Sequence, residues 1–270
     1  MQTLCVVGDD ATAVANELVA AISERHDGRV AAVGYRSDME SDISGAAPPA
    51  ADGEFTLGAD GRWRGEGTDR SLVDQLDALA PDYDYTVVAG ASHHRLPAVV
   101  VGDDIDERAN VVAEAPTADA VDTADLAARI DEFEPHVTLE TLVAEAKASP
   151  LAERAGAIAT FTGQVRVKDS PDDSRTEHLA FEKYEGVAAE RMAAISDELT
   201  DREGVFEVLM HHRVGVMAAG EEIVFVVVLA GHREEAFRTV EDGINRLKDE
   251  VPIFKKETTE DAEFWLHERA

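Results

Sequence analysis

The stretch EEIVFVVVLAGHREEAFRTVEDGINRLKDEVPIFKKE, residues 221–257, decides the fold of the second half of this chain. It opens with a continuous apolar run, residues 223–231, of the kind that forms a buried strand. Apolar residues then recur at alternating steps of three and four: Phe237, Val240, Ile244, Leu247 and Val251. This spacing predicts an amphipathic helix that buries the stripe. Pro252 should end the helix, because a proline pushes the residue before it out of the helical region.

The same stretch concentrates lysine in a chain that has 56 acidic residues against 25 lysines plus arginines. Three of the six lysines lie within its last eleven positions: Lys248, Lys255 and Lys256. Clustered cations and partial burial both lower a lysine's pKa, and a lysine tuned in this way can act as acid, base or nucleophile. Lysines are usually solvated surface residues. In so acidic a chain, however, the cluster favours an anion-binding or catalytic pocket.

The composition limits the possible binding partners and indicates the ionic environment in which the protein works. A formal net charge of −31 repels nucleic acid and anionic membranes, while 44% hydrophobic residues in periodic runs argue against disorder. We interpret the acidity as adaptation to a very salty cytoplasm, as in a halophilic archaeon, because at about 1 M salt the Debye length falls to about 3 Å. The N-terminus lacks a signal peptide and no apolar run can span a bilayer, so we expect a soluble, cytoplasmic protein.

Two domains are predicted, at residues 1–135 and 136–270. The first alternates strands and helices, which is typical of a Rossmann-like or P-loop-like α/β fold with a parallel sheet. Within it we expect a loop over residues 37–53, a hairpin that turns at Asp60-Gly61 and an acidic helix over residues 117–135. The turn after Gly8 is where a phosphate-binding loop would lie, but the second glycine, the lysine and the hydroxyl of that motif are absent. Asp9 and Asp10 also place negative charge there. We therefore expect a scaffold turn and no nucleotide site. Cys5 should be a buried apolar residue.

The second domain is predicted to be α+β, with strands at residues 156–166 and 205–215 beside the strand and helix quoted above. A turn that contains Gly220 is expected to join the strand at 205–215 to the strand that follows it. Two histidine pairs, His93-His94 and His211-His212, invite a metal-site hypothesis. Adjacent residues on a strand face opposite sides, so neither pair readily chelates one ion. No metal and no cofactor are predicted.

The ends of the quoted helix add a geometric constraint. His232 and Arg233 open the helix that Lys248 closes, and at about 1.5 Å per residue the ends lie more than about 20 Å apart. One subunit therefore does not bring both ends to one small ligand. If all these residues serve one site, a dimer shares it.

Several motifs, in order and spacing, resemble the large, catalytic subunit of molybdopterin synthase, the MoaE family. They are GAIATFTGQVR (156–166), YEGVA (184–188), HHRVG (211–215), GEEIVFVVVLAGHREEAF (220–237) and LKDEVPIFKKE (247–257). The resemblance covers about residues 137–265. It implies an α/β hammerhead fold and a sulfurtransferase that converts cyclic pyranopterin monophosphate to molybdopterin. The sulfur arrives as a thiocarboxylate on the Gly-Gly tail of a small ubiquitin-fold carrier, MoaD, and the enzyme is a homodimer within a heterotetramer.

The resemblance also assigns residues. Lys248 and Lys255 match the family's catalytic lysines. The positions that match its substrate-binding residues are Gln164, Val165, Arg166, His232, Arg233, Lys248, Lys255, Lys256 and Glu257. Of these, His232 and Arg233 match a pair that the dimer mate supplies.

Chemical roles follow for the matched positions. Arg166, His232 and Arg233 should hold the cyclic phosphate by charge-assisted hydrogen bonds. Lys255 should stabilise the oxyanion of the carrier's tail as sulfur departs. Lys248 is the candidate for proton transfer during sulfur addition and loss of water.

Some positions depart from the family pattern. Phe254 stands where tryptophan is frequent, Lys256 where arginine is common, and KYEGV (183–187) replaces the usual partner-facing run, so that loop is expected to differ. The first domain more faintly resembles MobB, a nucleotide-binding accessory protein, through YTVVAGASHHRLPAVVVGD (85–103). We predict a degenerate MobB-like domain fused to a molybdopterin synthase domain. The alternatives are a non-catalytic docking module for ubiquitin-like Gly-Gly tails and a working MobB-like nucleotide-binding adaptor.

Overall fold

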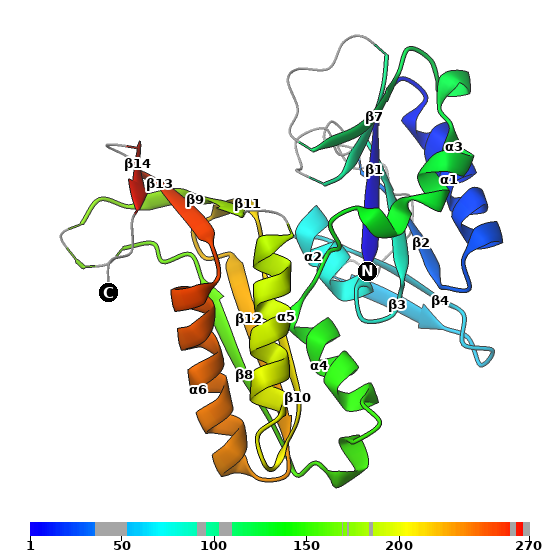
Figure 1. Ribbon diagram of the computed structural model, residues 1–270. Helices are drawn as coiled ribbons and strands as arrows, with labels where there is room; N and C mark the ends of the chain where they lie inside the picture. The colour runs from blue at the N-terminus through cyan, green and yellow to red at the C-terminus, as the bar shows by residue number, and fades with distance from the viewer. Residues whose placement is uncertain are drawn as a thin grey trace. The chain divides into compact units, whose positions relative to one another are not determined.

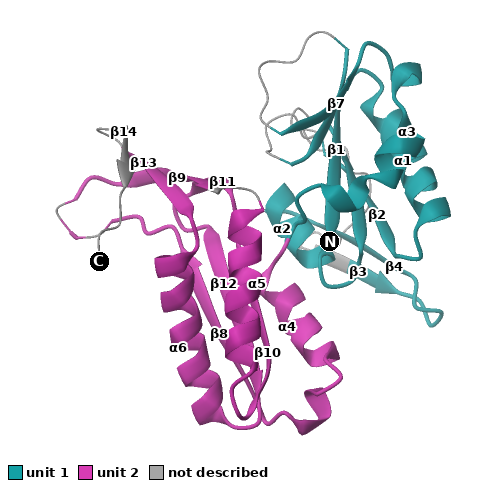
Figure 2. Ribbon diagram, in the orientation of Figure 1, with its two compact units in different colours: residues 1–136 teal, residues 137–270 magenta. Residues whose placement is uncertain are grey.

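The computed structural model describes residues 1–35, 53–90, 96–102, 110–168, 170–171, 173–183, 186–259 and 263–266. The chain forms two compact units, Met1–His136 and Val137–Ala270 (Figure 2). The unit boundary falls one residue after the predicted one. None of the helices in these ranges is long and apolar enough to cross a membrane.

The first unit is built on a parallel sheet, as predicted for an α/β fold. Its strands, in spatial order, are β2 (Val30–Gly34), β5 (Tyr85–Ala89), β1 (Gln2–Gly8), β6 (Ala98–Val101) and β7 (Val111–Ala115). Every neighbouring pair runs parallel. The central strand β1 is buried on both faces, and Cys5 on it is fully buried. A nearly continuous apolar run is what a strand covered on both faces requires.

Helices cover both faces of this sheet. On one face pack α1 (Ala11–Arg25) and α3 (Thr123–Ala128), and on the other packs α2 (Leu72–Leu79). We predicted one long acidic helix over residues 117–135, but the structure breaks it into η1 (Ala118–Ala120), α3 and η2 (Ile130–Glu132). The break has a local cause, because Asp122 leaves helical geometry and its carboxylate accepts a hydrogen bond from the Asp125 N–H, capping a new helix.

A separate two-stranded hairpin, β3 (Gly53–Leu57) and β4 (Trp63–Gly67), also belongs to the first unit. It turns at Asp60-Gly61 as predicted, and Gly61 has φ +83°, a left-handed conformation that favours glycine. The loop predicted for residues 37–53 lies almost wholly outside the described residues.

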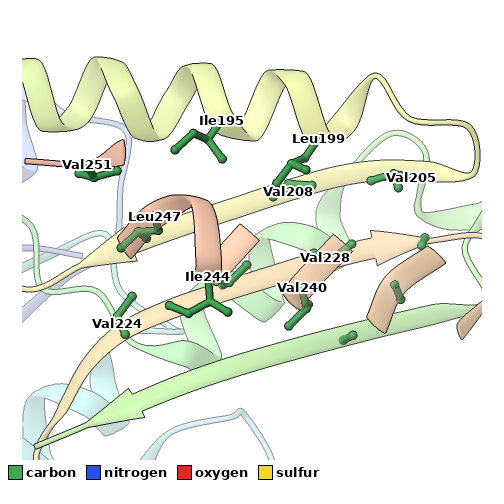
Figure 3. Packing of buried hydrophobic residues seen from close by; sticks show 14 of the residues in the cluster. Ile195, Leu199, Val205, Val208, Val224, Val228, Val240, Ile244, Leu247 and Val251 are labelled. Atoms are coloured by element: carbon green, nitrogen blue, oxygen red, sulfur yellow. The ribbon is translucent and has the colours of Figure 1, made fainter. Parts of the chain in front are cut away.

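The second unit contains an antiparallel sheet of three strands in the order β10 (Val205–His212), β12 (Glu222–Ala230), β8 (Ala157–Gln164). Helix α4 (Leu139–Ala148) packs on one face, while α5 (Val187–Thr200) and α6 (Arg233–Glu250) lie side by side on the other (Figure 1). Side chains such as Ile195, Val228 and Leu247 fill the space between these two helices and the sheet (Figure 3).

A second antiparallel sheet has the order β11 (Gly215–Ala218), β9 (Thr176–Lys183), β13 (Ile253–Thr259), β14 (Glu263–Leu266). We predicted that a simple turn joins the strands now seen as β10 and β12. The structure instead inserts β11 between them, because residues 215–218 leave the first sheet and pair with β9.

Helix α6 ends as predicted, since Glu250 is its last residue and Val251 is extended at φ −91°, ψ 124° before Pro252. One member of the predicted stripe is placed differently. Phe237 is 67% exposed, whereas Val240, Ile244 and Leu247 are buried. The buried arc of α6 is completed by Ala236 and Gly243 instead, because contact with both the sheet and α5 turns the helix so that Phe237 lies on its flank.

Candidate functional site

The end of β8 positions Gln164 and Arg166 through the residue between them. Val165 is 1% exposed and packs with Leu179 and Phe181 of β9. Its N–H donates to the Glu221 carbonyl at 2.8 Å, and its own carbonyl accepts from the Gly220 N–H at 2.9 Å. Both neighbours of this anchored valine are exposed. Val165 therefore has a structural role, and Gln164 and Arg166 are the side chains presented to solvent.

Strand β13 presents its two lysines to opposite faces of the second sheet. Lys255 lies directly across from Phe181, and Lys256 from Ala180. Directly opposed residues on antiparallel strands share a face, and successive residues alternate. Lys255 thus shares its face with Phe181 and Ile253, the side chains that pack with Val165. This arrangement brings Lys255 to the side of the sheet on which β8 ends.

Glu257 lies on the same face as Lys255, two residues further along β13. The hydroxyl of Thr176, which is buried at the start of β9, donates a hydrogen bond to the Glu257 carboxylate. The bond restrains a carboxylate near the lysine. No signal in the sequence pointed to Thr176, because it lies in a polar run. Only the pairing of β9 with β13 brings it beside Glu257.

Lys248 lies in the last turn of α6, close in the chain to Lys255. Only Val251 and Pro252 separate the helix from β13, and the Val251 N–H still donates to the Leu247 carbonyl at 3.1 Å. Val251 is buried against the core (Figure 3), so this connection is fixed. A cation at a helix C-terminus is also favoured by the helix dipole. Lys248 itself is exposed.

Ion pairing distinguishes Arg246, on the same helix as Lys248, from the two lysines. Arg246 of α6 pairs with Glu198 of α5, and Asp242 of α6 pairs with Arg202, two residues after the end of α5, each at 2.6 Å. Within the part of the chain that the structure describes, the side chains of Lys248 and Lys255 make neither an ion pair nor a hydrogen bond. In a chain this rich in carboxylates, two uncompensated ammonium groups are available to an anionic ligand.

The opposite end of α6 carries His232 and Arg233, both exposed. Sixteen residue steps at about 1.5 Å each place His232 about 24 Å from Lys248. The pairing of β12 with β8 leads to the same conclusion. Ala230, at the end of β12 beside His232, pairs with Ala157. Glu222, at the other end of β12, pairs with Gln164. The structure thus gathers Gln164, Arg166, Lys248 and the β13 residues at one end of the three-stranded sheet. It leaves His232 and Arg233 at the other.

The two histidines at the end of β10 lie on opposite faces of the strand, as predicted for adjacent strand residues. His211 stacks near Phe225 with ring centroids 6.4 Å apart, while His212 makes an edge contact with Phe181 at 5.0 Å. The two rings thus point to opposite sides of the strand. Among the described residues, no group of three or more His, Cys, Asp or Glu side chains has a metal-binding arrangement. His93-His94 lie outside those residues.

Comparison with known proteins identifies the family. Residues 134–250 match the family described as "MoaE protein". A "Probable molybdopterin synthase" from Haloferax volcanii is 57% identical over 272 residues, covering the whole of both chains. A "Molybdopterin synthase catalytic subunit" from Pyrococcus abyssi is 36% identical over 124 residues, covering 46% of this chain and 82% of the relative.

The predicted MobB-like domain has weaker support. A solved structure described as a MobB protein homolog from Bacillus stearothermophilus has a TM-score of 0.32 and 19% identity, covering 49% of this chain and 94% of that one. A likeness at this level carries no argument, so the MobB-like interpretation stays a prediction. The full-length match to the Haloferax volcanii protein is decisive for the chain as a whole. The chain therefore belongs to the MoaE family of molybdopterin synthases.

Proposed function

We propose that this chain transfers sulfur from the C-terminal thiocarboxylate of a MoaD-like ubiquitin-fold carrier to cyclic pyranopterin monophosphate, forming molybdopterin. The observation that carries the proposal is the placement of Lys248 and Lys255, which lack acidic partners among the described residues, at the same end of the three-stranded sheet as Arg166. The substrate and the carrier's tail are both anionic. Two uncompensated lysines at one site fit both of them.

The phosphate of the substrate is assigned to the arginines and the histidine. Arg166 follows the anchored Val165 and is exposed at the end of β8. His232 and Arg233 complete the phosphate site from a second copy of the chain, because α6 is too long for one copy to supply both ends. A guanidinium presents paired donors that match phosphate oxygens.

The two lysines are assigned to the chemistry. Lys255, held on the face of β13 that packs toward β8, stabilises the negative charge that develops on the acyl oxygen of the carrier's tail as sulfur leaves. Lys248, on the adjoining helix end, transfers protons as sulfur adds to the pterin and water is lost. Gln164 and Glu257 line the site without a covalent role, whereas Lys256 lies on the opposite face of the second sheet.

The test is a sulfur-transfer assay in high potassium chloride. Purified protein, the cyclic pterin precursor and a thiocarboxylated MoaD-like carrier are combined, and molybdopterin is detected as its fluorescent oxidation product. The matched control is the same carrier ending in an ordinary carboxylate, which binds through the same surface but holds no sulfur to give. We expect product only with the thiocarboxylate. A bound carrier that yields no product would show a docking module instead of an enzyme.

A further inference from the structure

Thr176, at the start of β9, connects two segments of the candidate site. Its backbone N–H donates to the carbonyl of Val167, one residue after Arg166, at 2.9 Å. Its hydroxyl donates to the carboxylate of Glu257 on β13. An ionised carboxylate only accepts hydrogen bonds, so the hydroxyl is the donor, and such a charge-assisted bond is stronger than a neutral one. Thr176 is 7% exposed, so a buried donor holds the carboxylate.

A bulge in β9 gives Thr176 this position. Strands β9 and β13 lie side by side (Figure 1), and His178 lies across from Thr258. Regular alternation would put Thr176 on the same face as His178, away from Glu257. The register shifts after this pair, however, and Thr176 lies across from Thr259, which shares the face of Glu257. Bulges are frequent beside active sites, where they re-aim a side chain.

Glu257 and Lys255 are close enough in the strand to form an ion pair. Two residue steps of about 3.4 Å separate them by about 7 Å, which two long side chains can bridge. Both residues are half-buried, on the face that packs with Val165. The structure nevertheless shows no such pair, since the Lys255 side chain makes neither an ion pair nor a hydrogen bond with any described residue.

We infer that Thr176 is a positioning residue: its hydroxyl turns the Glu257 carboxylate away from Lys255 and leaves the Lys255 ammonium available to an anionic ligand. The direction of the bond supports this role. Thr176 lies across from Thr259, which is on the side of Glu257 away from Lys255. The identity of the anion, the carrier's thiocarboxylate tail, rests on the proposed function, whereas the arrangement of the three side chains does not.

The first experiment measures the availability of the Lys255 amine without substrate or carrier. The folded full chain, in high potassium chloride, is treated with a trace of acetic anhydride, and tandem mass spectrometry gives the acetylation rate of each of the six lysines. A carboxylate beside an ammonium stabilises the protonated form, which is not a nucleophile. Thr176→Val keeps the shape of the side chain but removes the hydroxyl. We expect Lys255 to react about threefold more slowly in this variant, the effect of one partly exposed ion pair.

The controls separate the hydroxyl from the rest of the side chain. Thr176→Ser keeps the hydroxyl and should acetylate Lys255 at the wild-type rate. Glu257→Gln should do the same, because the wild-type carboxylate does not pair with Lys255, and so should Thr176→Val,Glu257→Gln. Lys147, exposed on α4, is the internal reference and should react equally in every variant. Circular dichroism checks that each variant folds, and Thr176→Ala, which also lacks the hydroxyl, replaces Thr176→Val if that variant does not.

The second experiment measures sulfur transfer in the same variants. A carboxylate paired with Lys255 would weaken the stabilisation of the oxyanion. Thr176→Val should therefore lower the single-turnover rate roughly tenfold, while the affinity for the carrier changes less than about threefold. In the Glu257→Gln background the same substitution should lower the rate less than about twofold, because the competing charge is gone. A merely structural role of Thr176 would produce equal losses in both backgrounds.

The outcomes are separable from those of the proposed function. Unchanged acetylation of Lys255 without the Thr176 hydroxyl, or faster acetylation in Glu257→Gln, would overturn the inference. Equal losses of rate in the two backgrounds would also overturn it. The expected acetylation pattern in a protein that makes no molybdopterin would support the positioning role and contradict the proposed chemistry alone.

Discussion

Lys255 and Lys256 are neighbours in β13 but lie on opposite faces of the second sheet, Lys255 across from Phe181 and Lys256 across from Ala180. Lysine enrichment alone does not distinguish them, and the register of β13 against β9 shows which face each one occupies. The face of Lys255 is the one that packs with Val165 at the end of β8. The two lysines should therefore contribute unequally to the reaction.

The first prediction concerns this inequality. Lys255→Ala should lower the rate of molybdopterin formation by about 10²–10³, the usual effect of removing a group that stabilises an oxyanion. Lys256→Ala should lower it by less than about tenfold, or about 1.4 kcal/mol, since Lys256 lies on the face of the second sheet opposite Lys255 and Val165. Single-turnover rates with saturating carrier measure both. Equal losses would remove the distinction between the two lysines.

The second prediction concerns the shared site. Arg233→Ala and Lys248→Ala should each be nearly inactive alone. Mixed and allowed to exchange subunits, they should recover about a quarter of wild-type activity, because half of the dimers are mixed and one of the two sites in each is intact. Mixing Arg233→Ala with Arg233→Ala,Lys248→Ala is the matched control, since no intact site can form. No recovery in exchanged dimers would place Arg233 and Lys248 in sites of the same chain.

The third prediction concerns pH. Desolvation and the negative charge of Glu207 raise the pKa of Glu145, on α4, from its ordinary value of 4.5. A raised carboxyl pKa means that the folded state favours the protonated form of Glu145. Relative to its value below the unfolded-state pKa, the free energy of unfolding therefore falls as pH rises through the folded-state pKa. Glu145→Gln should therefore raise the melting temperature at about pH 7 and have little effect near pH 4.

A matched change on the same helix supplies the control for that prediction. Glu140 lies in the first turn of α4, where a negative charge is favoured by the helix dipole. Glu140→Gln removes the same charge and should lower the melting temperature at about pH 7. Thermal melts monitored by circular dichroism distinguish the two variants. A lowered melting temperature for Glu145→Gln would contradict the assignment.

The fourth prediction concerns salt. A net charge of −31 makes the folded chain repel itself unless counterions screen the charges. The melting temperature should rise steadily as potassium chloride increases from about 0.1 M to about 2 M, as the Debye length falls from about 10 Å to less than about 3 Å. Sodium chloride at equal ionic strength should act similarly if screening is the cause. A melting temperature that falls with salt would contradict the interpretation of the acidic surface.

Regular periodicity made much of the fold predictable from the sequence. The parallel alternation of the first unit, the turn at Gly61 and the end of α6 before Pro252 each follow from local rules about strands, turns and proline. The segmented helix around Asp122 was missed, because a capping carboxylate inside an acidic run looks like any other acid. Strand β11 was missed because its partner, β9, lies far away in the chain.

Candidate residues for the site could be proposed from the sequence, but their arrangement could not. Lysine enrichment singled out Lys248 and Lys255, and helix length alone separated both from His232. Three features needed the tertiary structure: the opposite faces of Lys255 and Lys256, the hydrogen bond from Thr176 to Glu257, and the exposure of Phe237. Each depends on strand register or on the packing of α6 against α5, which contacts between distant residues determine.

The central claim, that these lysines perform sulfur transfer, is tested most directly by one comparison. Molybdopterin formation from cyclic pyranopterin monophosphate and thiocarboxylated carrier is measured for wild type, Lys248→Ala and Lys255→Ala, with carrier binding measured alongside by calorimetry. We predict that both variants still bind the carrier but form product at least about 10² times more slowly than wild type. Product at the wild-type rate from either variant would contradict the account.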